Sequence, residues 1–264
     1  MIRSARRTAG LAAVALLTGL GLTACSSSED SAAGTGDGSP RGTVTVFAAA
    51  SLKETFTALG ERFEQRHPGT EVTFNFGGSD SLAAGIAGGA PADVFAAAST
   101  TTMDRVADEG LTAGDPATFT RNRLEIATAP GNPHGITSLK DLADPGLKVV
   151  LCDETVPCGA AARKALKAAG VRVTPASYEQ DVKSALTKVR LKEADAAVVY
   201  RTDVRAAGDK VDGVDFPEAA QAVNDYPIAR LESSGNPVTA DAFVALVTSP
   251  EGRKVLRGAG FLTP

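Results

Sequence analysis

Two serines stand where a predicted strand gives way to a predicted helix. Ser51 directly follows the apolar run in "VTVFAAASLKETF", and Ser79 follows a Gly-Gly pair in "FGGSDSLAAGI". A hydroxyl at a helix start accepts a bond from the backbone and still has one proton to donate. The first N–H groups of a helix are unpaired and carry the positive end of its dipole. The pattern therefore indicates anion binding, although either serine alone is also explained as a helix N-cap, with Glu54 completing a capping box.

Two further helix starts and one strand end share this character. "VPCGAAARKAL" places Cys158 at a helix start beside a glycine that allows close backbone approach. "SYEQDVKSAL" places Asp181 in an N-cap position with Val182 just inside the helix. Tyr200 ends the strand "DAAVVY", so its hydroxyl either reaches into a cleft or lies in water. Together these positions predict several hydrogen-bond donors around one anion.

Catalysis is the alternative interpretation of the serines, and its signatures are missing from the sequence. Neither Ser51 nor Ser79 lies in a G-x-S-x-G elbow, and no zinc or phosphate-loop motif occurs. His67 and His134 lie in the loop-like segments "RHPG" and "NPHG", and Asp93 is typical of a strand-start carboxylate. We therefore expect no catalytic residue and no cofactor, and an extracytoplasmic serine hydrolase remains the alternative from another class.

Predicted strands and helices alternate from residue 43 onward, which favours mostly parallel sheets covered by helices. Ligands of such sheets bind at the carboxyl ends of strands, where the helices begin. The number of elements exceeds one sheet, so we predict an α/β fold of two lobes. Pro130 and the segment near Tyr226 are the expected crossings. Lobe 1 is then 43–128 plus 227–264, and lobe 2 is 129–226.

The N-terminus has the architecture of a secretory signal. Three arginines in "MIRSARR" precede the apolar run "LAAVALLTGLGL", which is too short for a comfortable membrane span. "LTAC" then resembles a bacterial lipobox, so we predict a signal peptide at 1–24 and lipidation of Cys25, with a flexible tether over 25–42. Acyl chains would hold the protein at the outer face of the cell membrane. An ordinary cleavage site followed by a free cysteine is the other interpretation.

Composition and charge exclude some partners. Apolar residues make up 43% of the chain, enough for a substantial core, while aromatic residues reach only 5% and tryptophan is absent. Without residues 1–24 the chain has 24 basic and 31 acidic residues, a formal charge of −7. Nucleic-acid binding relies on a positive field, so we expect no nucleic-acid partner.

Cys152 and Cys158 lie close together in "LCDETVPCG". Outside the cytoplasm, two such cysteines plausibly pair, and we favour a disulfide. Two reduced, buried thiols are the alternative. A metal site is less well supported, because both histidines lie in loop-like segments elsewhere.

Five motifs in order along the chain resemble the molybdate-binding proteins of ATP-driven uptake transporters. They are "VFAAASLKETF", "GGSDSLAAGIAGGAPADVFAAAS", "VPCGAAARKAL", "DVKSAL" and "AAVVYRTDV". The resemblance implies a type II periplasmic-binding-protein fold that closes on a tetrahedral oxyanion. It implies ligand contacts from the Ser51, Ser79 and Tyr200 hydroxyls and from the backbone N–H groups of Cys158 and Val182. No side chain would contact the metal atom directly.

The resemblance further implies a monomeric receptor that gives molybdate, and tungstate as well, to the membrane permease of an ABC transporter. A receptor for another oxyanion such as sulfate is the alternative within the same fold, and a purely structural lipoprotein is the last. Two positions depart from the family pattern. Asp80 follows the second serine where a small neutral residue is common, and we expect it to cap the next helix. Cys158 stands where alanine is common.

Overall fold

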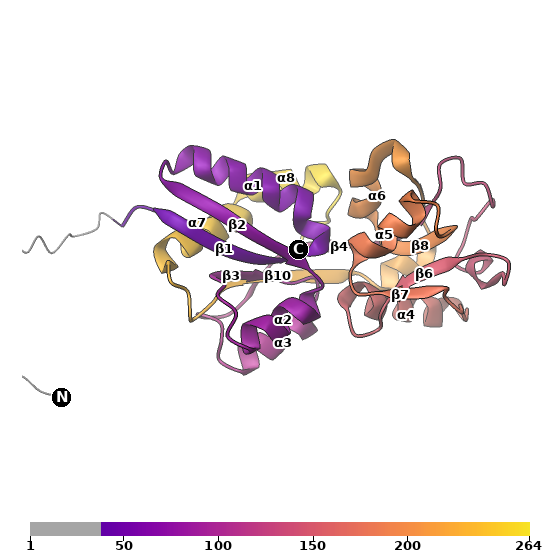
Figure 1. The fold of residues 1–264 in the computed structure, drawn as a ribbon, viewed down its shortest axis with the longest axis horizontal. Helices are drawn as coiled ribbons and strands as arrows, with labels where there is room; N and C mark the ends of the chain where they lie inside the picture. Colours follow the sequence, from indigo (N-terminus) through magenta and orange to yellow (C-terminus); the bar gives the residue numbers. More distant parts are fainter. Residues whose placement is uncertain (1–37) are drawn as a thin grey trace, which may run out of the picture. The chain divides into compact units, whose positions relative to one another are not determined.

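The computed structural model describes residues 38–264 (Figure 1). The predicted signal peptide, the lipidation site Cys25 and the tether as far as residue 37 lie outside the described residues. The described part forms one unit with two lobes, each built on its own five-stranded sheet. The predicted two-lobed α/β fold is thereby confirmed.

Lobe 1 contains the first sheet, with strand order β2-β1-β3-β10-β4. In that order the strands are β2 (Thr70–Gly77), β1 (Gly42–Ala49), β3 (Val94–Ala96), β10 (Asn224–Arg230) and β4 (Ala117–Asn122). Only β10 runs against its neighbours; the β1 pairs with β2 and β3 are parallel. The carboxyl ends of β1, β2 and β3 therefore meet at one edge of the sheet.

Helices cover both faces of the first sheet, which explains why β1 is apolar along most of its length. Val46 and Ala48 point into the core under α1 (Lys53–Arg66), α7 (Pro237–Thr248) and α8 (Pro250–Ala259). Phe47 points into the core under α2 (Ser79–Ala87) and α3 (Thr100–Asp108). The α1 residues Phe56 and Phe63 lie on one helical face and pack against the ring of Phe243 from α7. Both cores hold the ends of β1 and β3 in fixed positions.

Lobe 2 contains the second sheet, with strand order β7-β6-β8-β5-β9. In that order the strands are β7 (Ser177–Glu179), β6 (Val149–Cys152), β8 (Ala196–Tyr200), β5 (Leu124–Thr128) and β9 (Asp212–Val214). Here β5 is the strand that runs against its neighbours. A single apolar cluster of α4 (Pro157–Ala169), α5 (Val182–Arg190) and the strands forms the core of this lobe.

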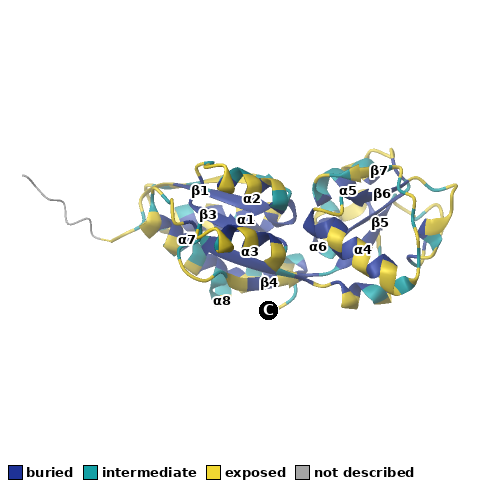
Figure 2. Ribbon diagram, turned by 90° about the horizontal axis from the view of Figure 1, so that it is seen from below, coloured by how far each residue is buried: buried dark blue, intermediate teal, exposed yellow. Residues whose placement is uncertain are grey.

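Most helices and 3-10 turns begin within a few residues of the end of a strand. The α-helices are α1 (Lys53–Arg66), α2 (Ser79–Ala87), α3 (Thr100–Asp108), α4 (Pro157–Ala169), α5 (Val182–Arg190), α6 (Arg201–Ala207), α7 (Pro237–Thr248) and α8 (Pro250–Ala259). Short 3-10 turns are η1 (Ala50–Leu52), η2 (Asp141–Ala143), η3 (Gly208–Lys210) and η4 (Pro217–Gln221). Figure 2 shows buried strands beneath helices whose outer faces are exposed. Within residues 38–264, no helix has the length and apolar character needed to cross a membrane.

The chain crosses between the lobes slightly earlier than the sequence predicted. The expected first crossing was Pro130, but Leu124 already pairs with Tyr200 in the second sheet, so the crossing falls at Arg123. The return was expected near Tyr226, but Asn224 already pairs with Asn122 in the first sheet. The two long strands β4 and β10 therefore lie side by side at the crossing, and their ends become part of the region between the lobes.

Candidate functional site

One small cavity brings together all five residues that the sequence predicted as oxyanion ligands. Both lobes line it, and the volume of the cavity is about 20 Å³. By the same measure one water molecule needs about 10–15 Å³, so the cavity has room for a compact ion and not for a large metabolite. Its lining consists of Ala49, Ala50, Ser51, Gly77, Gly78, Ser79, Ala98, Val156, Pro157, Cys158, Asp181, Val182 and Tyr200.

Ser51 lies in η1, directly after β1, and is buried. The sequence assigned it to a capping box with Glu54, and this was wrong, because no side chain caps η1 or α1. Its Oγ instead lies 2.8 Å from the hydroxyl of Tyr226 in β10. The hydroxyl is thus held by a distant strand and keeps hydrogen-bonding capacity for the cavity.

Ser79 is the first residue of α2, and Gly78 holds the N-cap position. Its buried Oγ accepts a hydrogen bond from the N–H of Ala98 at 3.0 Å, which leaves its own proton free to donate. Gly78 beside it has no room for a side chain, since a Cβ there would lie 2.4 Å from the carbonyl oxygen of Gln180. The two lobes therefore approach each other closely at this glycine.

Lobe 2 presents backbone N–H groups at the starts of α4 and α5. Pro157 opens α4 and has no N–H, so Cys158 carries the first donor of that helix. Asp181 caps α5 as predicted, accepting from the N–H groups of Lys183 and Ser184 at 2.8 and 2.9 Å. The cap does not use the N–H of Val182, the first residue of α5. Neither the N–H of Cys158 nor that of Val182 has a backbone partner among the described residues, and both helix starts, with their positive dipole ends, line the cavity.

Tyr200 supplies the one buried side-chain donor of the cavity that is left unsatisfied within residues 38–264. The residue is 1% exposed, and its hydroxyl has no hydrogen-bond partner among the described residues. Burial raises the pKa of this phenol well above its usual range, and Tyr226 and Asp203 nearby raise it further, so it stays protonated. A buried hydroxyl without a partner costs about 1–3 kcal/mol, which a ligand oxygen would remove.

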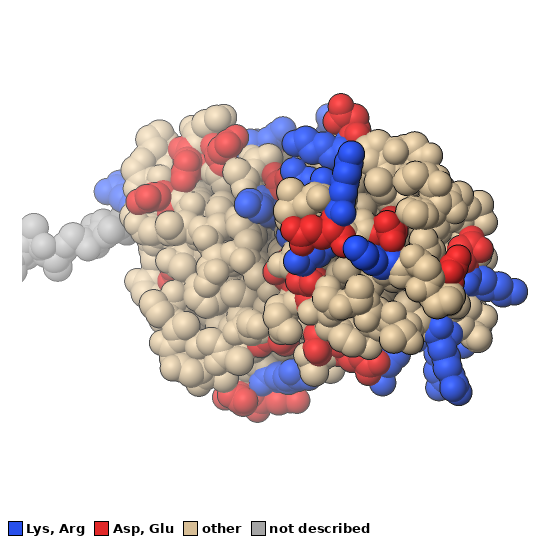
Figure 3. All heavy atoms as spheres, turned by 45° about the vertical axis from the view of Figure 1, so that its right-hand side comes forward, with Lys and Arg blue, Asp and Glu red and all other residues tan. Residues whose placement is uncertain are grey.

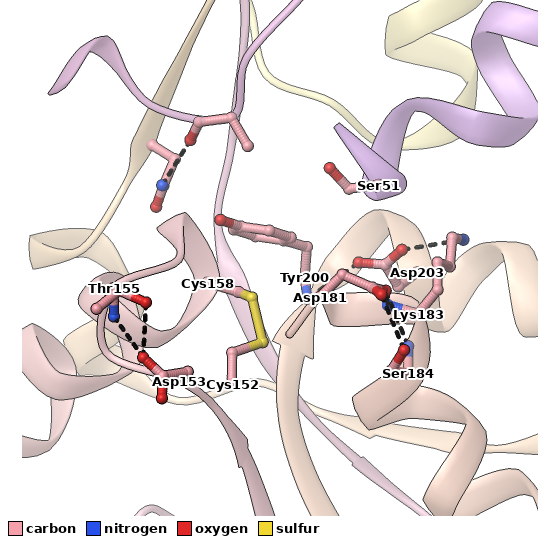
Figure 4. Close-up of a disulfide and its surroundings, with 12 residues drawn as sticks. Ser51, Cys152, Asp153, Thr155, Cys158, Asp181, Lys183, Ser184, Tyr200 and Asp203 are labelled. Carbon is pink, nitrogen blue, oxygen red and sulfur yellow. Dashed lines mark hydrogen bonds and ion pairs between the residues drawn. A yellow bond between two sulfur atoms is a disulfide. The ribbon is translucent and has the colours of Figure 1, made fainter. Parts of the chain in front are cut away.

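A disulfide joins Cys152 at the end of β6 to Cys158 in α4, the pairing that the sequence favoured. Figure 4 shows the ring of Tyr200 between Ser51 and this disulfide. The bond closes the short turn that leads into α4, directly behind the Cys158 N–H. Gly159 in the first turn of α4 has no room for a side chain, because a Cβ there would meet the carbonyl oxygen of Asp153 at 1.8 Å.

Charged groups lie beside the cavity and not in its walls, apart from the capping carboxylate of Asp181. The described residues that line it include no lysine or arginine. Just outside, Lys183 of lobe 2 contacts Glu54 of lobe 1 at 2.8 Å and the buried Asp203 at 3.0 Å. Burial raises the pKa of Asp203 to about 6, against the opposing effect of Lys183. Burial works against the charge of Lys183, but Asp203 and Glu54 outweigh it and raise its pKa.

The sequence missed this charged cluster and the contact of Tyr226 with Ser51, because both join residues far apart in the chain. It also predicted that Asp80 caps α2, and this was wrong. Asp80 lies in the first turn of α2 without a capping hydrogen bond, and its buried Oδ1 has no partner within residues 38–264. Asp80 is outside the set of described residues that line the cavity.

The hydrolase interpretation gains no support from the geometry. The contacts of Ser51 and Ser79 are a tyrosine hydroxyl and a backbone N–H. His67 packs against Phe63, and His134 pairs with Asp195 in lobe 2. Within the described residues no group of three or more His, Cys, Asp or Glu side chains could hold a metal ion. The face drawn in Figure 3 intermixes basic and acidic side chains and carries no continuous basic field.

Comparisons with known proteins agree with this geometry. A family profile described as bacterial extracellular solute-binding protein matches residues 44–262. The molybdate-binding protein ModA of Mycobacterium tuberculosis is 45% identical over 244 residues, which cover 92% of this chain and 94% of that protein. The molybdate-binding protein ModA of Escherichia coli is 31% identical over 234 residues, which cover 83% and 89%.

Among solved structures, the periplasmic molybdate-binding protein of Azotobacter vinelandii superposes with a TM-score of 0.73. The superposition covers 84% of this chain and 99% of that one, at 22% sequence identity. At that identity the likeness concerns the fold alone, and it matches the two lobes described above.

Proposed function

The chain belongs to the bacterial extracellular solute-binding proteins, and from this premise we propose that it is a receptor for molybdate, binding tungstate as well. It would deliver the anion to the membrane permease of an ABC transporter. Its relatives named for molybdate binding support this ligand. The family consists of solute-binding proteins and not of enzymes.

The observation that carries the proposal is the buried hydroxyl of Tyr200, which has no hydrogen-bond partner in the part of the chain that the structure describes. Around it we assign the remaining donors to Ser51, Ser79 and the N–H groups of Cys158 and Val182, all of which line the same cavity. These groups would contact the oxygens of the anion, and none would contact the metal atom. A cavity lined by donors suits a fully deprotonated oxyanion, because a protonated one would leave a buried donor without an acceptor.

The proposal extends to the cellular setting of the protein. Residues 1–24 would act as a signal peptide, and lipidation of Cys25 would hold a monomeric receptor at the outer face of the membrane. The tether over 25–42 would leave the two lobes free to approach the permease. Mass spectrometry of the exported protein tests the anchor: a mature chain starting at an acylated Cys25 is expected, and an unmodified cysteine would contradict it.

Calorimetric titration of the purified protein tests the ligand. Molybdate and tungstate are expected to bind tightly with one site, and sulfate and hydrogen phosphate much more weakly. Sulfate binding as tightly as molybdate would make the protein a receptor of another oxyanion. Absence of binding by all four anions, in protein shown to be folded, would contradict the receptor function.

The substitution Tyr200→Phe tests the role of the Tyr200 hydroxyl, because molybdate affinity and protein stability should change in opposite directions. Molybdate binding should weaken by roughly 1.5–3 kcal/mol, about 10- to 150-fold, through loss of a donor to a charged oxygen. The empty protein should be as stable as before or more stable, since an unpaired buried hydroxyl is gone. Tyr178→Phe is the matched control: this tyrosine is 52% exposed, and its loss should change neither quantity.

A further inference from the structure

We propose that Asn122 and Tyr226 set the direction of the Ser51 hydroxyl, so that it donates to the ligand and the site rejects protonated oxyanions. This inference rests on the proposed function and deepens it. Neither Asn122 nor Tyr226 is among the described residues that line the cavity. Both are therefore positioning residues that act through Ser51.

The first step is the orientation of the Asn122 amide. Its Oδ1 accepts a hydrogen bond from the N–H of Arg123 at 3.0 Å, and a backbone N–H can only donate. Its Nδ2 must then face the other way, toward Thr202 Oγ1 at 2.8 Å and the hydroxyl of Tyr226 at 3.4 Å. The amide thus donates to both hydroxyls, and its orientation follows from the network around it.

The second step is the direction of the Tyr226 hydroxyl. Asn122 Nδ2 can only donate, so of these two contacts of the Tyr226 hydroxyl only Ser51 Oγ, 2.8 Å away, can receive the hydrogen of Tyr226. Burial raises the pKa of this phenol, which keeps the hydrogen in place. Ser51 Oγ therefore accepts from Tyr226, and the hydrogen of Ser51 remains for the cavity.

Fold and burial support the same arrangement. Tyr226 and Asn122 are fully buried, and Ser51 is 4% exposed, so water does not compete for these hydrogen bonds. The register between β4 and β10 shifts between Tyr226 and Pro227, where Phe119 of β4 has no partner in β10. Thr202 belongs to α6 of lobe 2, so the chain of hydrogen bonds also connects the two lobes where the polypeptide crosses.

The consequence is a site in which both serines are fixed as donors by different means. Ser79 is held by the backbone N–H of Ala98, which no side-chain substitution removes. Ser51 is held by side chains, so its direction can be reversed. An acceptor in place of the Asn122 amide nitrogen would take the hydrogen of Tyr226. Tyr226 would then accept from Ser51, whose oxygen would face the ligand as an acceptor.

Asn122→Asp should reverse the direction of the Ser51 hydroxyl. The reversal can be detected by comparing the binding of two tetrahedral anions that differ in one hydrogen. At about pH 8.5 sulfate and hydrogen phosphate are both dianions, so the added carboxylate repels them alike. Competition against bound molybdate gives the ratio of their affinities. We expect this ratio to move at least tenfold toward hydrogen phosphate in Asn122→Asp. We also expect the shift to disappear in Asn122→Asp combined with Tyr226→Phe, which cuts the chain between Asn122 and Ser51.

An unmoved ratio in folded Asn122→Asp overturns the inference. Should that variant fail to fold, Tyr226→Phe alone decides: molybdate affinity is expected to fall at least fivefold although Tyr226 does not line the cavity, and unchanged affinity overturns the inference. Tyr178→Phe is the control, because this tyrosine is 52% exposed and its loss should leave the ratio unchanged. Failure of the unaltered protein to bind molybdate would overturn the proposed function as well, whereas molybdate binding with an unmoved ratio overturns only this inference.

Discussion

The two walls of the cavity provide hydrogen-bond donors in different ways. Lobe 1 contributes side-chain hydroxyls, Ser51 and Ser79, while lobe 2 contributes the N–H groups of Cys158 and Val182 together with Tyr200. A hydroxyl rotates and can donate or accept, so its direction depends on a partner. A backbone N–H at a helix start has a direction fixed by the helix itself.

This difference explains which groups are held by supporting contacts in each lobe. In lobe 1 the hydroxyls have partners at 2.8 and 3.0 Å, which lie in strand β10 and just after strand β3. In lobe 2 the supports act on the helix starts: Asp181 caps α5, and the disulfide closes the turn into α4. Substitutions can therefore delete donors on the lobe 1 wall, whereas most changes on the lobe 2 wall leave its backbone donors in place.

The largest effect is expected for Ser79→Ala on the lobe 1 wall. It removes a proposed ligand donor, which should weaken molybdate binding by roughly 1.5–3 kcal/mol, and it leaves the buried N–H of Ala98 unpaired, which should lower stability by about 1–3 kcal/mol. Titration and denaturant unfolding measure the two effects. Ser99→Ala is the matched control, since Ser99 also accepts from a backbone N–H but lies outside the cavity lining. A Ser79→Ala protein that loses stability yet binds normally would remove Ser79 from the site.

A pH effect on stability comes next, from Asp203 behind the lobe 2 wall. Its pKa is raised from 3.8 to about 6, so the folded protein holds a proton that the unfolded chain releases. The stabilisation is complete below about pH 4 and is lost as the pH rises through about 6, amounting to at most about 3 kcal/mol. Unfolding midpoints at several pH values should show this for the unaltered protein relative to Asp203→Asn. Parallel pH profiles for the two proteins would contradict it.

Sequence reasoning predicted the contacts between residues close in the chain and missed those between distant residues. The cavity residues were predictable because strand ends and helix starts are local patterns, and the Asp181 cap is a contact within one turn. The capping role of Ser51 was wrong because its partner Tyr226 lies 175 residues away and competes successfully for the hydroxyl. The same distance hid the contact between Glu54 and Lys183, which are 129 residues apart.

The lobe boundaries illustrate a second limit of sequence patterns. The segment around Pro130 marks the end of a strand but does not reveal which sheet the strand joins. The pairing of Leu124 with Tyr200 shows that the strand belongs to the second sheet. That pairing depends on β8, which lies some seventy residues further along the chain. Asp80 is a further case, because a carboxylate in the first turn of a helix suits the dipole without making a cap.

A proline at Val182 would test whether the lobe 2 donors are backbone groups. Val182 is the first residue of α5, where proline is tolerated, and Asp181 before it has the extended conformation that proline requires. Val182→Pro should weaken molybdate binding by roughly 1.5–3 kcal/mol through loss of the N–H. Val182→Ala is the control that trims the side chain and keeps the N–H, and its affinity should stay near normal. Equal affinities of the two variants would show that this N–H does not bind the anion.

The smallest effect is expected where the two walls are joined by charge. Glu54 contacts Lys183 across the lobes, and the Glu54 side chain is 52% exposed, so the pair should contribute only about 0.2–1 kcal/mol to closure. Glu54→Gln should thus weaken molybdate binding no more than about fivefold, and the difference should shrink at about 1 M salt, because salt weakens exposed charge pairs. Glu251→Gln, which breaks contacts with Arg62 and Arg66 within lobe 1, should leave affinity unchanged. Tighter binding by Glu54→Gln would mean that the repulsion between Glu54 and the anion outweighs the attraction between Glu54 and Lys183. The ion pair would then oppose anion binding by the neutral donors of the cavity.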